Sequence, residues 1–479
     1  MAKNIQYDYV YRYEVLARLA QPLHIGNSSG DKCDVLVHPI THKPFIQATS
    51  LAGMMRDYSG GPFTEEDVSD LFGALRTEEN GNAAEKGSRV MFSDGLFVSG
   101  NDIGMELRPH VAIDPDSGAA KPKAKFNMEY IGTGACFVFE ITARSDEAHR
   151  EKTETIIETV LAALNNGEIQ LGGKKSSGCG KTELLSVMKK QYDMRTAEDR
   201  KAWIAASDIS DIELSGKPSE LQNEFETRFK GEHFDPISLD RETSDRIKYT
   251  ITLTGAPEGE MLVKSLSPYF DESKDTKQNR NDKKEADADS IRNAKGDYII
   301  PGSSIKGVLR HRTEAIAEYL EEKGKILSAE ELVGNMFGKT TEDKDPAKPG
   351  NVITRDAVIG GSKSIKQKRI HIDKFTGGVM YQKLFTERVV TGKDIKIEVD
   401  ILDGDDADAA AALILLVMRD VAVKSVSFGS GFNVGRGFIE AEELQIQDRS
   451  SGKTYSAKIR EKGENTLDEF GKSLLSKIS

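Results

Sequence analysis

Two stretches of the sequence repeat the same order of residues, and this repeat constrains the fold more than any other feature. Residues 300–310 read IPGSSIKGVLR, and residues 44–56 read PFIQATSLAGMMR. In the second copy a Pro-Gly turn follows an apolar segment, and the apolar positions after it recur with helical period. Ser303 and Ser304 are placed to cap exposed amides of that helix. The pattern predicts strand, turn and helix, in a structural unit that occurs twice.

Further matched segments follow each copy in the same order. They are residues 71–73 and 336–338, 88–94 and 351–356, 110–114 and 369–373, 126–130 and 384–388, and 171–180 and 428–437. The third and fourth pairs flank a Gly-bearing excursion, which predicts a projecting hairpin. The order strand, helix, strand, strand, helix, strand in each repeat suggests a split β-α-β or ferredoxin-like sheet with helices on one face.

The length of 479 residues predicts at least two domains. We expect a first domain at residues 1–192, a helical connector at residues 193–245 and a second domain at residues 246–447. The tail, residues 448–479, has the pattern of a polar hairpin followed by a short helix. Residues 271–289 are almost wholly Lys, Asp, Asn and Glu, so we expect a mobile loop there.

Composition limits where the protein acts and what it binds. No run of about 18 apolar residues occurs, and the first residues lack the apolar core of a signal peptide, so we expect a cytoplasmic protein. Three widely spaced cysteines argue against a disulfide framework. The net charge of −12 argues against nonspecific nucleic-acid binding, although phosphate contacts depend on local clusters of Lys and Arg.

The glycine-rich loops at residues 171–180 and 428–437 are the clearest binding signal. Closely spaced glycines let backbone amides approach phosphates, and neighbouring cations add charge. Two tight turns are the alternative, which duplication at the same place in both repeats disfavours. The predicted phosphate contacts are Gly172, Gly173, Lys174, Lys175, Gly178, Gly180, Gly429, Gly431, Gly435 and Arg436.

Two other motifs are weak. Residues 178–182, GCGKT, end like a P-loop, but Lys175 stands where that motif needs glycine, so nucleotide hydrolysis is not expected. Cys33, His38 and His42 have the spacing of metal ligands, but a structural zinc site needs four ligands and no second pair lies nearby.

Basic residues concentrate at both predicted hairpins. Residues 121–125 read KPKAK, and the second cluster contains Lys363, Lys366, Lys368, Arg369 and Lys374. A charge run is usually a solvated face. Here equivalent places in both repeats carry one, and apolar residues such as Val379 and Met380 lie beside the second, which favours a nucleic-acid contact.

The signature and its matched segments resemble those of the RAMP proteins, which form the RNA-guided backbone of CRISPR type III effector complexes. The resemblance covers nearly the whole chain. It implies an α+β fold of two fused RRM/ferredoxin-like domains with inserted thumb hairpins and a helical connector. It also implies that the glycine-rich loops hold the guide RNA and that each thumb wedges into the guide-target duplex. The other implied RNA contacts are Ser50, Arg56, Ser303, Ser304, Lys306, Arg310, Arg369 and His371.

Aspartates precede each copy of the signature, at the edge of a polar loop. They are Asp34 in the first repeat and Asp287 or Asp289 in the second, where a carboxylate can reach a divalent ion and an RNA phosphate. In RAMP backbone subunits an aspartate in this segment cuts the target RNA with a metal ion. The resemblance carries that catalytic role onto Asp34 and onto Asp287 or Asp289, with Asp34 and Asp287 as ligands of a divalent ion, expected to be Mg²⁺. Solvated loop aspartates are the alternative.

The resulting hypothesis is a guide-RNA-binding backbone subunit of a type III effector that cleaves complementary target RNA at one or two sites. The alternatives are a non-catalytic structural subunit and an endoribonuclease that processes the guide. Two units in one chain resemble the type III-D and III-E variants. At this length the chain is too short to be a complete single-protein effector, so other type III subunits are expected as partners.

Overall fold

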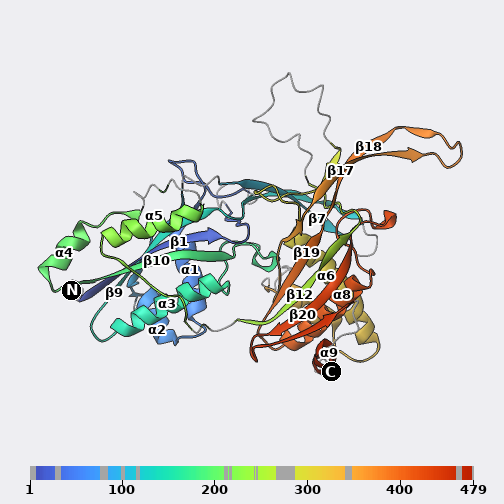
Figure 1. Ribbon diagram of the computed structural model, residues 1–479. Coiled ribbons are helices and arrows are strands. Elements are labelled where there is room, and N and C mark those ends of the chain that lie inside the picture. Colours follow the sequence, from blue (N-terminus) through green and yellow to red (C-terminus); the bar gives the residue numbers. More distant parts are fainter. Residues whose placement is uncertain are drawn as a thin grey trace, which may run out of the picture. The chain divides into compact units, whose positions relative to one another are not determined.

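The computed structural model divides the chain into two compact units (Figure 1). It describes residues 7–26, 34–75, 85–98, 103–114, 119–209, 214, 218–241, 243, 246–265, 286–339, 348–459 and 466–476. Unit 1 comprises Met1–Met105, Glu129–Lys175 and Cys179–Ser244, and unit 2 comprises Glu106–Met128, Ser176–Gly178 and Asp245–Ser479. Unit 2 therefore includes two segments from the first half of the chain, which a division by sequence order does not anticipate. Most of the loop expected at residues 271–289 lies outside the described residues.

Unit 1 is built on an antiparallel sheet around β1 (Tyr9–Leu19). This strand pairs with β10 (Thr182–Asp193) on one side and with β9 (Cys136–Ser145) on the other. The remaining strands are β2 (Phe45–Ile46), β5 (Val90–Phe92), β6 (Gly95–Phe97) and β11 (Asp235–Pro236), in the order β11-β10-β1-β9-β6-β2 with β5 also paired to β9. A separate two-stranded sheet pairs β3 (Ala74–Leu75) with β4 (Glu85–Lys86). The first long strand of the repeat, β1, thus lies between the last, β10, and the one before it, β9. This is the ferredoxin-like order that the sequence predicts.

Helices cover both faces of this sheet. On one face α1 (Ala48–Ser59), α2 (Glu65–Phe72) and α3 (Arg150–Asn166) bury a core that includes the alternating tyrosines of β1. The predicted connector contains α4 (Ala197–Ile204) and α5 (Pro218–Gly231). The apolar residues Leu221, Phe225 and Phe229 of α5 pack in a core with residues on the opposite face of β1, β9 and β10. The connector is thus part of unit 1, as Figure 1 shows for α5.

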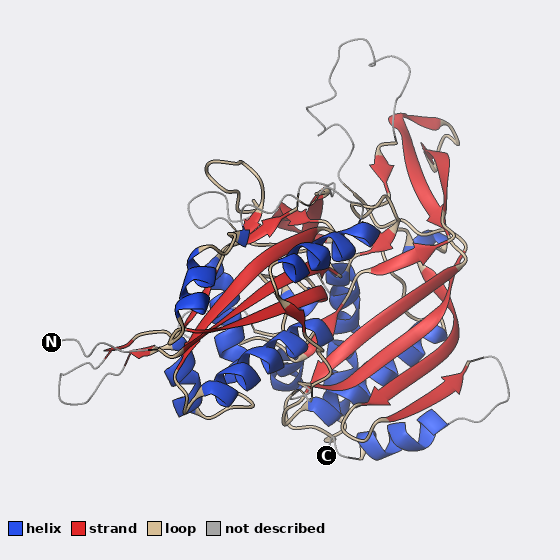
Figure 2. Ribbon diagram, turned by 60° about the vertical axis from the view of Figure 1, so that its left-hand side comes forward, coloured by secondary structure: helices blue, strands red, loops and turns tan. Residues whose placement is uncertain are grey.

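Unit 2 repeats this architecture around β12 (Ile247–Glu258), which pairs with β19 (Asp394–Leu402) and β20 (Phe438–Asp448). The sheet order is β14-β16-β19-β12-β20-β21, with β15 also paired to β19. The other strands are β14 (Ile299–Ile300), β15 (Val352–Thr354), β16 (Ala357–Gly360) and β21 (Lys453–Lys458). Its helices are α6 (Gly302–Glu322), α7 (Ala329–Phe337), α8 (Ala407–Ala422) and α9 (Thr466–Leu475) (Figure 2). The tail forms the expected hairpin and helix, and Leu467 and Leu474 of α9 join the core.

Two long hairpins lie outside the two large sheets. One consists of β7 (Met105–Ile113) and β8 (Ala120–Ile131), and the other of β17 (Lys363–Ile372) and β18 (Val379–Thr391). The short β13 (Ala288–Asp289) pairs with β18 in parallel. Figure 1 shows the β17–β18 hairpin running away from the sheet of unit 2, as predicted for a projecting element. Within the described residues, no helix combines the length and apolarity needed to cross a membrane.

The β7–β8 hairpin packs into unit 2 through a buried charge cluster. The Arg108 guanidinium contacts Glu106 at 2.5 Å and Asp356 at 2.7 Å, and all three side chains are at least nine-tenths buried. Glu106 also accepts a hydrogen bond from the Ala294 amide at 2.7 Å. Because buried charges need partners, these contacts fix the base of the hairpin.

The signature turn is capped differently from the prediction. The N-cap of α6 is Pro301, so Ser303 lies within the first turn, and an Asp356 carboxylate oxygen accepts the Gly302 amide at 2.8 Å. In α1 the equivalent amide of Ala48 donates to Asp94 at 2.7 Å. An aspartate from a neighbouring segment therefore caps both signature helices, and the contact confirms that the two signatures are equivalent.

Candidate nucleic-acid interface

The two glycine-rich loops have the same backbone hydrogen bonds. The Leu171 amide donates to the Gly180 carbonyl oxygen at 2.9 Å, and the Phe428 amide donates to that of Gly437 at 2.8 Å. Two further pairs of bonds tie the loops to the segments after β1 and β12: Gly173 to His24 and Ser430 to Leu262, and Gly180 to Pro22 and Gly437 to Glu260. The loops are therefore two copies of one turn, held in the same shape by the rest of each repeat.

Some of the glycines are required by the chain itself. Gly180 has φ +83°, and a Cβ added there would lie 1.9 Å from the Leu171 carbonyl oxygen. At Gly437, with φ +85°, the corresponding distance to Phe428 is 2.2 Å. The tight-turn interpretation therefore accounts for these two positions. Phosphate contact is left to the exposed part of the loops, at Gly173, Lys174, Lys175, Gly429 and Gly435.

Three other predicted glycines lie close to neighbouring segments or to their own loop. Gly178 is buried, and an added Cβ would lie 2.3 Å from the Thr354 carbonyl oxygen within unit 2. A Cβ added at Gly172 would lie 2.3 Å from the His24 carbonyl oxygen, and one added at Gly431 would meet the side chain of Arg436. Gly178 is therefore hidden from a ligand, whereas Gly172 and Gly431 are half-buried and shape the loops.

Arg436 is buried and has three side-chain partners. Its side chain is 3% exposed, with Nε 3.0 Å from Glu260 and its terminal nitrogens 2.7 Å from Glu387 and 2.7 Å from the Gln367 side chain. Arg369 also contacts Glu387, at 3.2 Å. Since a guanidinium has five donor hydrogens in a fixed plane, these three acceptors occupy most of them. Arg436 thus ties the second loop to the hairpin, and we do not propose it as a phosphate contact.

The predicted contacts on the signature helices are divided between surface and interior. Arg56 is exposed on α1. Arg310 pairs with Glu314 on its own helix at 2.9 Å and remains 41% exposed, so a phosphate can compete for it. The Lys306 ammonium donates to the Ser176 hydroxyl at 2.7 Å within unit 2. Ser50, Ser303 and Ser304 are half-buried in the first helical turns.

The β17–β18 hairpin combines exposed cations with exposed apolar residues. Ile372 and Val379 are each 61% exposed near its tip. His371 is exposed, and its ring lies 6.1 Å from that of Phe385 on the opposite strand. The exposed lysines are Lys363, Lys366, Lys368 and Lys374. Apolar and aromatic side chains flanked by cations can contact bases and phosphates together.

The β7–β8 hairpin has the same combination. The ring of His110 stacks on that of Phe126, with centroids 5.2 Å apart, and Phe126 is 42% exposed. Lys121, Lys123 and Lys125 of β8 are exposed. Both repeats therefore place a cross-strand histidine–phenylalanine pair beside a row of lysines, and the sequence predicted the cations but not the ring pairs.

The three candidate aspartates lie in different environments. Asp34 is exposed and has no hydrogen bond or ion pair with any other described residue. Asp287 is also exposed, and its carboxylate accepts the Thr386 amide at 2.6 Å. Asp289 is 9% exposed and is paired with Arg388 at 2.6 Å.

Backbone contacts show which aspartates are equivalent. Gly26 bridges to Val35 in the first repeat, and Lys264 bridges to Ser290 in the second. Next to each bridge there is a matching hydrogen bond of 2.8 Å. The Leu36 amide donates to the Ile25 carbonyl oxygen, and the Ile291 amide donates to that of Val263. Asp34 and Asp289, each immediately before the bridged residue, are therefore counterparts, and Asp287 stands two positions earlier.

The same comparison reveals two residues that the sequence analysis missed. Leu23 bridges to Ile131 and Met261 bridges to Val390, so residues 129 and 388 are counterparts. The first repeat has Glu129 there, whose carboxylate accepts the Val35 amide at 3.1 Å, and the second has Arg388. The match of residues 126–130 with 384–388 was one residue out of register.

The protein alone does not build a closed metal site in the described part of the chain. No group of three or more His, Cys, Asp or Glu side chains converges among those residues. Cys33 of the weak zinc motif lies outside them. Mg²⁺ typically takes one or two carboxylates and completes its shell with water and substrate phosphates. The exposed Asp34 beside Glu129 fits such a shared ion, whereas the pairing of Asp289 with a guanidinium does not.

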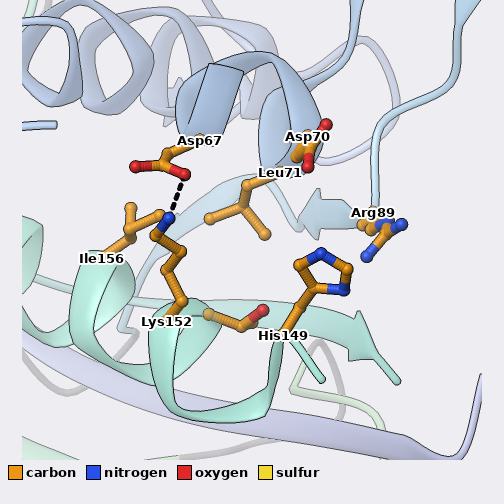
Figure 3. Close-up of a pocket in the computed structure, with 8 residues that line it drawn as sticks. Asp67, Asp70, Leu71, Arg89, His149, Lys152 and Ile156 are labelled. Atoms are coloured by element: carbon orange, nitrogen blue, oxygen red, sulfur yellow. Dashed lines mark ion pairs between the residues drawn. The ribbon is translucent and has the colours of Figure 1, made fainter. Parts of the chain in front are cut away.

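A small pocket of unit 1 lies between α2 and α3 (Figure 3). Lys152 forms an ion pair with Asp67 across it, and this hydrogen bond is the main cause that lowers the pKa of Asp67. His149 and Arg89 both contact Asp146, at 2.6 and 3.6 Å. The basic side chains that line the pocket therefore already pair with acidic side chains. The ion pair of Lys152 with Asp67 joins α3 to α2, and the pocket offers little to a substrate.

Comparison with known proteins agrees with the repeat. A family model described as the RAMP superfamily matches residues 17–183 and residues 223–440. A search of curated proteins finds no match. The two matched regions contain both signatures and both glycine-rich loops.

Proposed function

Because the chain belongs to the RAMP superfamily, we propose that it is a guide-RNA-binding backbone subunit of a type III CRISPR effector that also cleaves complementary target RNA. RAMP proteins bind RNA and act in CRISPR complexes. The fusion of two units in one chain favours the type III-D or III-E variants, in which further effector subunits would be partners. Sequence specificity would come from base pairing between guide and target, while the protein contacts backbone and shape.

The repeated hairpin is the observation that carries this proposal. Each repeat presents a histidine–phenylalanine pair with one exposed ring, and a row of exposed lysines, on a long hairpin. Base stacking on aromatic side chains is tolerant of sequence, and lysines neutralise phosphates, so such a hairpin suits a duplex of any sequence. The exposed lysines of the first glycine-rich loop, Lys174 and Lys175, would hold the guide backbone.

The proposed reaction is transesterification of the target strand. The 2′-oxygen attacks the adjacent phosphorus in line, the bond from phosphorus to the 5′-oxygen breaks, and the products are a 2′,3′-cyclic phosphate and a 5′-hydroxyl. The proton of the 2′-hydroxyl passes to the Asp34 carboxylate or to water, and the departing 5′-oxygen takes a proton from water. Holding the strand bent beside the hairpin would favour in-line geometry.

A divalent ion would supply charge stabilisation when bound with the phosphate, and Mg²⁺ is the ion that we propose. Asp34 is the residue that would hold it, and Glu129 lies beside the same segment. The carboxylates of Asp34 and Glu129 would keep the local charge negative, which attracts a cation.

A non-catalytic backbone subunit is the second candidate function. The ion pair between Asp289 and Arg388 favours it for the second repeat, because a buried carboxylate that already neutralises a guanidinium is poorly placed to react.

Cleavage of a labelled target by the guide-loaded assembly tests the proposal. The wild type with Mg²⁺ should cut a complementary RNA, and Asp34→Asn should remove at least one cut while guide binding is retained. Asp405→Asn is the matched control, since Asp405 is an exposed aspartate in the loop before α8. Binding of guide and target without any cut, with or without Mg²⁺, would leave the structural role only, and failure to bind guide would reject both.

A further inference from the structure

We propose that only the first repeat cuts, because Arg388 holds Asp289, the counterpart of Asp34, out of the reaction. This inference rests on the proposed nuclease function and adds that its two sites are unequal. It follows from comparing the two repeats position by position, since the duplication supplies an internal reference for each residue.

The carboxylate of Asp289 has no free oxygen. One oxygen accepts the Ser290 amide at 2.8 Å, and the other contacts the Arg388 guanidinium at 2.6 Å. The side chain of Asp289 is 13% exposed and that of Arg388 is 24% exposed, so water screens the pair only in part. A charge-assisted hydrogen bond of this kind withdraws the negative charge that a base or a cation ligand requires.

The first repeat lacks this lock. Glu129 occupies the place of Arg388, and a carboxylate cannot pair with Asp34. Glu129 turns one oxygen to the Val35 amide instead. Asp34 consequently stays exposed, without an ion pair among the described residues. One difference in side-chain charge thus separates an available carboxylate from an occupied one.

Asp287 does not replace Asp289. It stands two positions before the counterpart of Asp34, and the Thr386 amide on β18 holds its carboxylate at 2.6 Å. We therefore expect no cut that depends on Asp287.

The test uses the guide-loaded assembly and a labelled RNA complementary to the guide across both repeats. The wild type should give a cut that Asp34→Asn abolishes and that Asp287→Asn and Asp289→Asn retain. Loss of any cut in Asp287→Asn or Asp289→Asn would overturn the inference.

A gain of function makes the test sharper. Arg388→Glu gives the second repeat the residue of the first, and Arg388→Gln removes the charge with a smaller disturbance. At least one of them should create a new cut, which the added Asp289→Asn substitution should remove. If both variants fold and bind guide but neither gains a cut, Arg388 is not the reason why the second repeat does not cleave the target.

Thermal unfolding of the protein without RNA gives a readout independent of activity. Asp289→Asn should lower the melting temperature because it leaves Arg388 partly buried without its partner, whereas Asp34→Asn should not. Equal shifts of the melting temperature in the two variants would contradict the proposal that Arg388 holds Asp289. If the wild type binds guide and target without cutting, the nuclease function fails, and the melting comparison still decides whether Asp289 and Arg388 are paired.

Discussion

At the scale of single residues, Gly180 and Gly437 make the clearest prediction. Replacing either by alanine forces a Cβ against a carbonyl oxygen at a backbone angle that L residues avoid. We expect each substitution to lower the free energy of unfolding by about 3 kcal/mol, measured by urea denaturation.

Gly435→Ala is the matched control. Gly435 has φ +77°, but nothing lies within 4 Å of an added Cβ. Only the backbone strain remains, so Gly435→Ala should lower the free energy of unfolding by about 1 kcal/mol. Equal losses at Gly435 and Gly437 would contradict the argument from close approach.

The buried Glu14 predicts a pH-dependent stability. Burial raises its pKa to about 8, while the neighbouring Arg12 guanidinium, 2.5 Å away, lowers it in part. The folded protein therefore retains a proton that the unfolded chain releases above its ordinary pKa of 4.5. Stability should be highest at low pH within this range and decrease as the pH rises toward 8.

This decrease should amount to about 2 kcal/mol between pH 5.5 and 7.5, measured by urea denaturation at several pH values. In Glu14→Gln the decrease should be much smaller. Glu183→Gln, which alters an exposed glutamate of β10, should leave it unchanged. An equal decrease in Glu14→Gln would show that Glu14 is not its source.

The unequal aspartates show what the sequence could not reveal at this scale. The sequence names Asp34, Asp287 and Asp289 as candidates. It leaves the choice between Asp287 and Asp289 open, because it does not reveal the ion pair of Asp289 with Arg388, which is distant in sequence and reaches Asp289 through the β13–β18 pairing. The burial of Arg436 depends on similarly remote partners.

At the scale of elements, the projecting β17–β18 hairpin should act in target binding without contributing to the core. Ile372→Ser combined with Val379→Ser should leave the melting temperature unchanged, because both side chains are already exposed. Target binding by the guide-loaded assembly should weaken by about tenfold, since apolar contacts with bases are lost. Filter binding measures this effect.

Leu327→Ser is the control, because Leu327 is fully exposed in the loop before α7 and away from the hairpin strands in sequence. It should not alter target binding. If both variants bind target equally well, the exposed residues of the hairpin do not touch the duplex.

The elements themselves were largely predictable. The alternating tyrosines of β1, the helical period after each signature and the hairpin legs all appear as expected, because each is a local pattern. The alignment of β8 with β18 was not predictable, because shifting it by one residue gives a similar match between the two sequences. Nor did the pattern of Leu221, Phe225 and Phe229 tell which sheet face α5 would cover.

At the scale of the whole molecule, a net charge of −12 must be reconciled with RNA binding. Groups of exposed lysines lie on the hairpins and on the first glycine-rich loop, so the local charge there differs from the total. We expect guide binding to weaken steeply as salt rises from about 50 to 300 mM, measured by filter binding, because bound counterions are released.

Lys363→Gln and Lys368→Gln should each reduce the slope of that salt dependence by about one, if each lysine contacts one phosphate. Lys424→Gln should not, because Lys424 already pairs with Glu258 at 2.6 Å. Binding that is insensitive to salt would exclude phosphate contacts as the main source of affinity.

The inclusion of the β7–β8 hairpin in unit 2 has a consequence for synthesis. Arg108 and Glu106 leave the ribosome long before Ala294 and Asp356, their partners in unit 2. At about 5–20 residues per second, the hairpin is without these partners for roughly 10 to 50 s. The nascent chain therefore cannot complete the packing of its first hairpin until residues of its second half have been made.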